Sequence, residues 1–169
     1  MRGLRKWATI LVLGTLLACA GSIAGTGANQ GWVYDELSMG EIDLLIEAID
    51  GVNYTRTIDD YGDPIWIVTV GYLGLRFSLV AYDDDSDPWA WEMIMAYGGF
   101  EMSYPPSVWE INDYNRTRRG VRTYLDSYGD PCIEADMYLD GGVTADAIVA
   151  FLERFIRTLD DFAEYIGFD

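Results

Sequence analysis

The chain has 169 residues, 50% of them hydrophobic, and its 28 acidic residues outnumber its 11 basic ones, which gives a net charge of −17. It contains no histidine, which excludes Ser-His and Cys-His nucleophile pairs and imidazole metal sites. The negative charge repels nucleic acids, whose protein partners present basic patches, and therefore argues against DNA or RNA binding.

The first residues have the pattern of a bacterial export signal. Arg2, Arg5 and Lys6 form a basic start, and residues 7–18 are an uncharged apolar run that is too short to span a bilayer. We therefore expect residues 1–18 to be a signal peptide. Its removal leaves eight arginines and no lysine against 28 acidic residues, a net charge of −20, and excludes a Ser-Lys dyad.

The end of this signal resembles a lipid attachment site. Residues 16–19, Leu-Leu-Ala-Cys, look like a bacterial lipobox, in which the chain is cut before the cysteine and a lipid is attached to it, here Cys19. Residues 19–34 include a run rich in glycine, alanine and serine that suits a flexible tether, and residues 35–169 remain for one domain. The prediction is a lipid-anchored protein of the cell envelope that faces the periplasm or the exterior. Cleavage after Ala20, giving a soluble secreted or periplasmic protein, is the alternative.

The first half of the domain is expected to contain one helix and four strands. Ser38 and Glu41 form a capping box, apolar residues at helical spacing follow, and Gly51 offers a left-handed stop. The strand-like stretches lie at residues 52–58, 65–71, about 73–82 and about 91–100.

The second half of the domain is expected to contain two helices and two strands. Ser107 and Glu110 form another capping box for a helix that should run to about Arg119. Two strands are expected at residues 121–125 and 132–139. Thr144 caps a long last helix whose apolar face includes Ile148, Leu152, Phe155, Leu159, Phe162 and Ile166. The order α-ββββ-α-ββ-α predicts an α+β fold in which helices flank an antiparallel sheet.

An acidic segment between the third and fourth strands resembles the opening of a calcium loop. Asp83, Asp85 and Asp87 have the spacing of the first calcium ligands, but Pro88 stands where the loop needs glycine and Ile94 stands where it needs glutamate. A solvated, charged hairpin end is therefore favoured, and we predict no metal site or cofactor.

Polar residues on the second helix form a further candidate site. Asn112, Asn115 and Arg119 are spaced three and four residues apart, so they share one helix face and could bind a peptide or an anion. The favoured interpretation is structural, with these side chains bonded to the following strand or to the end of their own helix. Cys132, at the start of an expected strand, should be a partly buried structural thiol.

These residues belong to a longer set that resembles a known family. The set comprises Ile111, Asn112, Tyr114, Asn115 and Arg119, then residues 124–126 and 129–131, Glu134, Asp136 and residues 141–143. It is similar to the C-terminal core of YbjN-domain proteins, a family described as bacterial sensory transduction regulators. The resemblance implies a fold like that of type III secretion chaperones. Tyr114 replaces a frequent tryptophan, Gly120 a frequent aromatic residue, and an export signal is unusual for such regulators.

The sequence thus predicts a non-catalytic envelope protein that binds another protein or has an accessory, regulatory role. The wide apolar face of the last helix suggests a homodimer. The alternatives are a calcium-dependent binder and a hydrolase that uses paired carboxylates, which would need two of them close together in a cleft.

Overall fold

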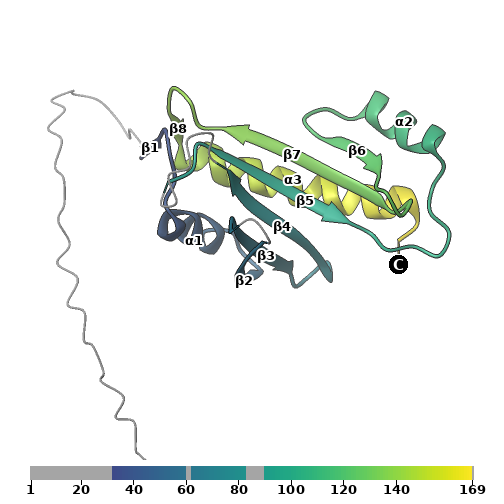
Figure 1. The fold of residues 1–169 in the computed structure, drawn as a ribbon, viewed down its shortest axis with the longest axis horizontal. Helices are drawn as coiled ribbons and strands as arrows, with labels where there is room; N and C mark the ends of the chain where they lie inside the picture. The colour runs from purple at the N-terminus through teal and green to yellow at the C-terminus, as the bar shows by residue number, and fades with distance from the viewer. Residues whose placement is uncertain (1–31, 60–61, 83–89, 169) are drawn as a thin grey trace, which may run out of the picture.

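The computed structural model defines residues 32–59, 62–82 and 90–168 (Figure 1). Cys19 and the calcium-like triplet Asp83, Asp85 and Asp87 lie outside these residues. The elements are β1 (Val33–Tyr34), α1 (Met39–Glu47), β2 (Val52–Ile58), β3 (Pro64–Val70), β4 (Leu75–Tyr82), β5 (Met93–Gly99), α2 (Val108–Thr117), β6 (Arg122–Leu125), β7 (Pro131–Tyr138), β8 (Val143–Thr144) and α3 (Ala145–Ile166). The α+β class is confirmed.

Both predicted capping boxes are present. The Glu41 carboxylate accepts bonds from the Ser38 amide at 2.8 Å and its hydroxyl at 2.6 Å, so α1 begins as expected. At α2 the Glu110 carboxylate accepts the equivalent bonds from Ser107, and these bonds lower its pKa. The helix ends at Thr117, before the expected residue 119, because the next residue has an extended backbone (ψ 156°).

The six-stranded sheet has the order β2-β3-β4-β5-β7-β6, and every neighbouring pair is antiparallel. The strands from β2 to β5 follow one another in space as in sequence. After α2 the chain returns to the outer edge as β6 and then turns back, so that β7 lies between β6 and β5. This inverted last hairpin places residues 131–138 inside the sheet, one strand from its edge.

In the aspartate-rich turn before β7, a side chain of the turn hydrogen-bonds to the backbone and stabilises its conformation. The Asp126 carboxylate accepts bonds from the backbone amides of Tyr128 at 2.8 Å and Asp130 at 2.9 Å. Gly129 has a φ of 89°, which a side chain would disfavour. Aspartate and glycine here set the turn geometry, as their types predict.

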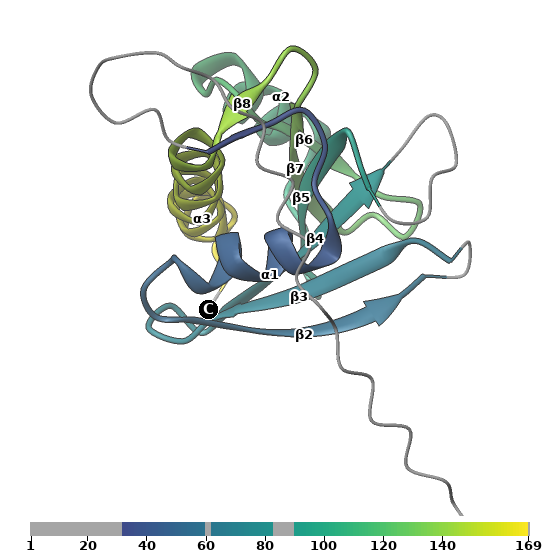
Figure 2. The ribbon, with the colours of Figure 1, turned by 90° about the vertical axis from the view of Figure 1, so that its left-hand side faces the viewer.

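All three helices lie on one face of the sheet. Figure 2 shows the sheet curving around α1 and α3, so this side is concave. The main core residues there are Ile42, Ile46, Trp66, Val68, Phe77, Leu79, Ile94, Ala96, Ile133, Ile148, Leu152, Phe155, Leu159 and Phe162. α2 joins the same layer beside β6, because the Tyr114 and Phe162 rings lie 4.9 Å apart. No described helix covers the opposite, convex face.

A two-stranded sheet was not predicted. β1 pairs with β8, and Leu37 bridges to Trp91 through bonds of 2.9 and 3.0 Å between their backbones. Strands of two residues are too short to show an alternating pattern. β1 falls within the last residues of the expected tether. Among the described helices, none has the length and apolar character needed to cross a membrane.

Candidate functional site

The convex face of the sheet carries a patch of apolar and aromatic side chains. Strand alternation places on it the residues that do not point into the concave core. The strand register puts Ile65 opposite Val80, and Val80 opposite Met95, so these three form one row across the sheet. We define the convex patch as Ile65, Ile67, Val80, Tyr82, Met93, Met95, Tyr97, Tyr124 and Tyr138. Apart from the buried Val80, its members are partly or well exposed.

A buried polar cluster adjoins this patch on β6 and β7. Glu134 is only 4% exposed, yet its carboxylate accepts a bond from the Tyr124 hydroxyl at 2.9 Å and contacts the Arg122 guanidinium. A buried carboxylate is costly unless it is paired and bonded, and these two partners supply both interactions. The cluster therefore fixes the side chains at one border of the convex patch.

The Cys132 thiol, on the same strand as Glu134, lies in surroundings that disfavour an activated nucleophile. Cys132 is buried, and its Sγ lies 3.0 Å from the Tyr97 hydroxyl. Burial raises the thiol pKa, and the weaker opposing effect of the Tyr97 hydrogen bond does not reverse the direction. Burial likewise raises the Tyr97 pKa above its usual value of 10.0. Because a nucleophilic cysteine must be the thiolate, this site favours packing over chemistry.

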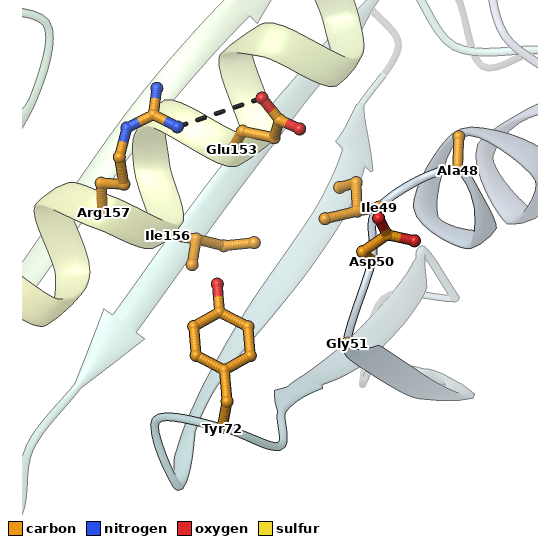
Figure 3. A pocket seen from close by; sticks show the side chains of 8 residues that line it. All are labelled: Ala48, Ile49, Asp50, Gly51, Tyr72, Glu153, Ile156 and Arg157. Carbon is orange, nitrogen blue, oxygen red and sulfur yellow. Dashed lines mark ion pairs between the residues drawn. The ribbon is translucent and has the colours of Figure 1, made fainter.

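A separate cleft of about 510 Å³ lies between the turn after α1, the β3–β4 turn and α3. Its lining residues are Ala48, Ile49, Asp50, Gly51, Tyr72, Glu153, Ile156 and Arg157 (Figure 3). Tyr72 is 68% exposed and turns its hydroxyl towards α3. The buried Ile49 and Ile156 give the cleft an apolar floor beneath a charged rim.

The two carboxylates of this cleft do not form the close pair that acid–base catalysis needs. Asp50 and Glu153 stand on opposite walls, and Glu153 is directed towards Arg157, with 4.0 Å between the charged atoms. In the described part of the chain, no three aspartate, glutamate or cysteine side chains are placed to hold a metal ion. The cleft can accommodate a small amphipathic group, and its two carboxylates are not arranged as a close acid–base pair.

Comparison with protein families identifies the family of the chain. Residues 41–168 match the YbjN family, whose description is "Putative bacterial sensory transduction regulator". The chain belongs to the YbjN family. The match runs from α1 to the end of α3 and includes every strand of the large sheet. No curated protein and no solved structure matches the chain.

In this YbjN domain the three polar residues expected to share one face of the second helix lie in different surroundings, and Arg119 lies beyond the end of α2 at Thr117. The Asn115 side chain bonds three groups of Thr123 on β6: the backbone oxygen at 2.8 Å, the amide at 2.9 Å and the hydroxyl at 3.0 Å. Arg119 donates to the carbonyls of Arg116 and Arg118 at the end of the helix. Asn112 is exposed. The structure thus does not bring these three side chains together into one binding site.

The sequence interpretation did not identify the residues of the convex patch or of the cluster around Glu134. A signal for both was present, because Cys132, Glu134 and Asp136 alternate with apolar residues along one strand, which predicts a strand with two different faces. The order of the strands in the sheet could not be predicted from such an alternating pattern. Only the pairing of β7 with β5 places Glu134 opposite Tyr97.

Proposed function

We propose that this YbjN domain is a non-catalytic protein-binding module of the bacterial cell envelope. The convex patch is the observation that carries the proposal. Isoleucine, methionine and tyrosine side chains form an adaptable surface of the kind enriched at protein interfaces. Contiguous apolar surface left open to solvent commonly marks an interaction site. The family's description as a regulator agrees with a binding role.

The partner we propose is a protein segment that presents apolar side chains flanked by arginine or lysine. The apolar side chains would pack on Ile65, Ile67 and Met95. Asp136, opposite Met95 in the register, offers a carboxylate for a basic neighbour. The large negative charge of the chain would speed the approach of such a partner and exclude acidic proteins.

Comparative capture from envelope extracts tests this function. Met95→Lys places a positive charge in the centre of the convex patch, where it repels a basic partner and removes apolar contact. Val108→Lys is the matched control, because Val108 is an exposed apolar residue at the start of α2 on the helix side. We expect a protein captured by the wild type and by Val108→Lys to be lost with Met95→Lys, while all three chains show the same thermal midpoint.

The proposal fails if Met95→Lys captures the same proteins as the wild type with unchanged affinity. It also fails if the captured proteins contact only the helix side of the domain, as mapped by cross-linking.

The envelope location is proposed from the lipobox-like residues 16–19 and the apolar run before them. A lipid on Cys19 would hold the domain at a membrane through the tether. Stable anchoring needs more than one acyl chain, so we expect multiple acylation. Cys19→Ala should release the protein from the membrane fraction and abolish lipid labelling. Mass spectrometry that finds an unmodified N-terminus at Gly21 would contradict the anchor.

A further inference from the structure

The outer edge of the sheet at β2 is open and has few of the features that block strand pairing. Within the described residues, β3 is the only strand beside β2. Its register with β3 is unbroken from Val52 to Ile58, without a bulge, and the strand contains neither proline nor lysine. Ile58 is 70% exposed, and the one charged residue, Arg56, is bonded to Asp43 of α1 at 3.0 Å. Such an edge is competent to pair with another strand.

The hydrogen bonds to β3 show which backbone groups of β2 point outwards. The Gly71 amide donates to the Gly51 oxygen at 3.1 Å, and the Asp59 amide donates to the Asp63 oxygen at 2.9 Å. In an antiparallel ladder the bonded pairs alternate, so the odd-numbered residues of β2 bond to β3. The amides and carbonyls of residues 52, 54, 56 and 58 therefore face the open edge.

We propose that a second copy of this chain occupies this edge, with β2 paired antiparallel to β2 about a twofold axis at Thr55. This register uses all four outward-facing residues of both copies and joins the two six-stranded sheets into one. It places Thr55 opposite Thr55, Asn53 opposite Thr57, Tyr54 opposite Arg56, and Val52 opposite Ile58 of the second copy.

The residues equidistant from Thr55 are complementary, which favours a second copy over an unrelated strand. Val52 covers the exposed Ile58, and β-branched residues face one another near the axis. Arg56 of one copy meets the ring of Tyr54 in the other, a cation–π arrangement. The Tyr54 hydroxyl donates to the Glu47 carboxylate at 3.2 Å, so this guanidinium also approaches a carboxylate.

In this proposal the dimer forms through the β2 edge, and not through the apolar face of α3, which had suggested a homodimer. The apolar stripe of α3 is buried in the domain's own core, including Leu152, Phe155 and Phe162. Pairing through β2 needs none of these residues. Seven paired residues give a small interface, so association should depend on protein concentration.

Cysteine cross-linking tests the proposed register. The test uses the full chain with Cys19→Ala, in which the buried Cys132 is the remaining native thiol. Thr55→Cys places a thiol on the axis, in a non-hydrogen-bonded pair with a Cα separation of about 4.5 Å, within reach of a disulfide. We expect mild oxidation to give a covalent dimer of twice the chain mass, which reductant reverses.

Thr57→Cys is the matched control on the same exposed strand. In this register its thiol lies about 13 Å along the strand from its copy, so it should not cross-link to itself. A mixture of Thr57→Cys and Asn53→Cys chains should cross-link. Self-cross-linking of Thr57→Cys at the rate of Thr55→Cys would overturn the register, and a Thr55→Cys product joined to a different protein would overturn the second copy as occupant.

Light scattering provides an independent test. Ile58→Lys places a charge opposite Val52 and should keep the chain monomeric at concentrations where the wild type and Val108→Lys approach twice the monomer mass. A wild-type chain that remains monomeric at millimolar concentration and high salt would overturn the proposal. This test does not depend on the convex patch, so the binding function and the dimer can fail separately.

Discussion

At the scale of single residues, Asn115 joins α2 to the sheet through three hydrogen bonds to Thr123 of β6. Its amide satisfies three groups of Thr123, which is buried, and removing it leaves them without that partner. We expect Asn115→Ala to lower the free energy of unfolding by about 1–3 kcal/mol. Asn112→Ala, on the exposed side of the same helix, should change it by less than about 0.5 kcal/mol. Urea unfolding measures both, and equal effects would contradict the assigned role.

Because of Cys132, we expect the free energy of unfolding of the domain to depend on pH in the alkaline range. Burial raises its thiol pKa above the ordinary 9.0, so the folded state favours the protonated form. The resulting stability is complete below the ordinary value and is lost as the pH rises through the folded-state value. Between about pH 8 and 10 the free energy of unfolding should therefore fall less steeply in Cys132→Ala than in the wild type. Urea unfolding at stepped pH gives both slopes, and parallel slopes would remove this role.

At the scale of elements, the contact of α3 with β5 depends on a glycine. A Cβ at Gly98 would lie 2.5 Å from Leu159 Cδ1 and 3.3 Å from Ile133 Cγ2, both on buried residues. Gly98→Ala should therefore destabilise the fold by about 1–3 kcal/mol through overpacking. Gly40→Ala in α1 meets no atom within 4 Å and should be neutral or stabilising, because alanine favours a helix. Thermal unfolding of both variants checks this, and an unaffected Gly98→Ala would show that α3 can shift away.

The elements themselves were largely predictable because their signals are local. Ser38 with Glu41 and Ser107 with Glu110 marked the starts of helices that the structure confirms. Partners distant in sequence were not predictable. The bond from the Trp66 indole to the Asp43 carboxylate at 2.7 Å joins β3 to α1 across 23 residues, and no local pattern announces it. The convex patch and the β2 edge likewise depend on strand order.

At the scale of the whole molecule, the two proposed surfaces are compatible. Thr55 lies on the convex side of β2, so a pairing centred on it continues the convex face from one copy to the next. The helices remain on the opposite side in both copies. A dimer of this kind would present two convex patches on one surface, and two linked sites can bind a partner with paired segments more tightly than one site can.

The charge of the molecule predicts how salt affects its stability. Beyond residue 18, eight arginines face 28 acidic residues, and two of the ion pairs in the described residues span 4.0 Å. Such exposed pairs contribute little, whereas repulsion among the excess carboxylates acts over the whole surface. Salt should therefore raise the thermal midpoint, by about 4 °C for each kcal/mol of repulsion that it screens. The thermal midpoint between low salt and 0.5 M sodium chloride is best measured on Ile58→Lys, so that self-association does not contribute. Sucrose at matched osmolality controls for excluded-solute effects, and a midpoint that falls with salt would show that the ion pairs outweigh the repulsion.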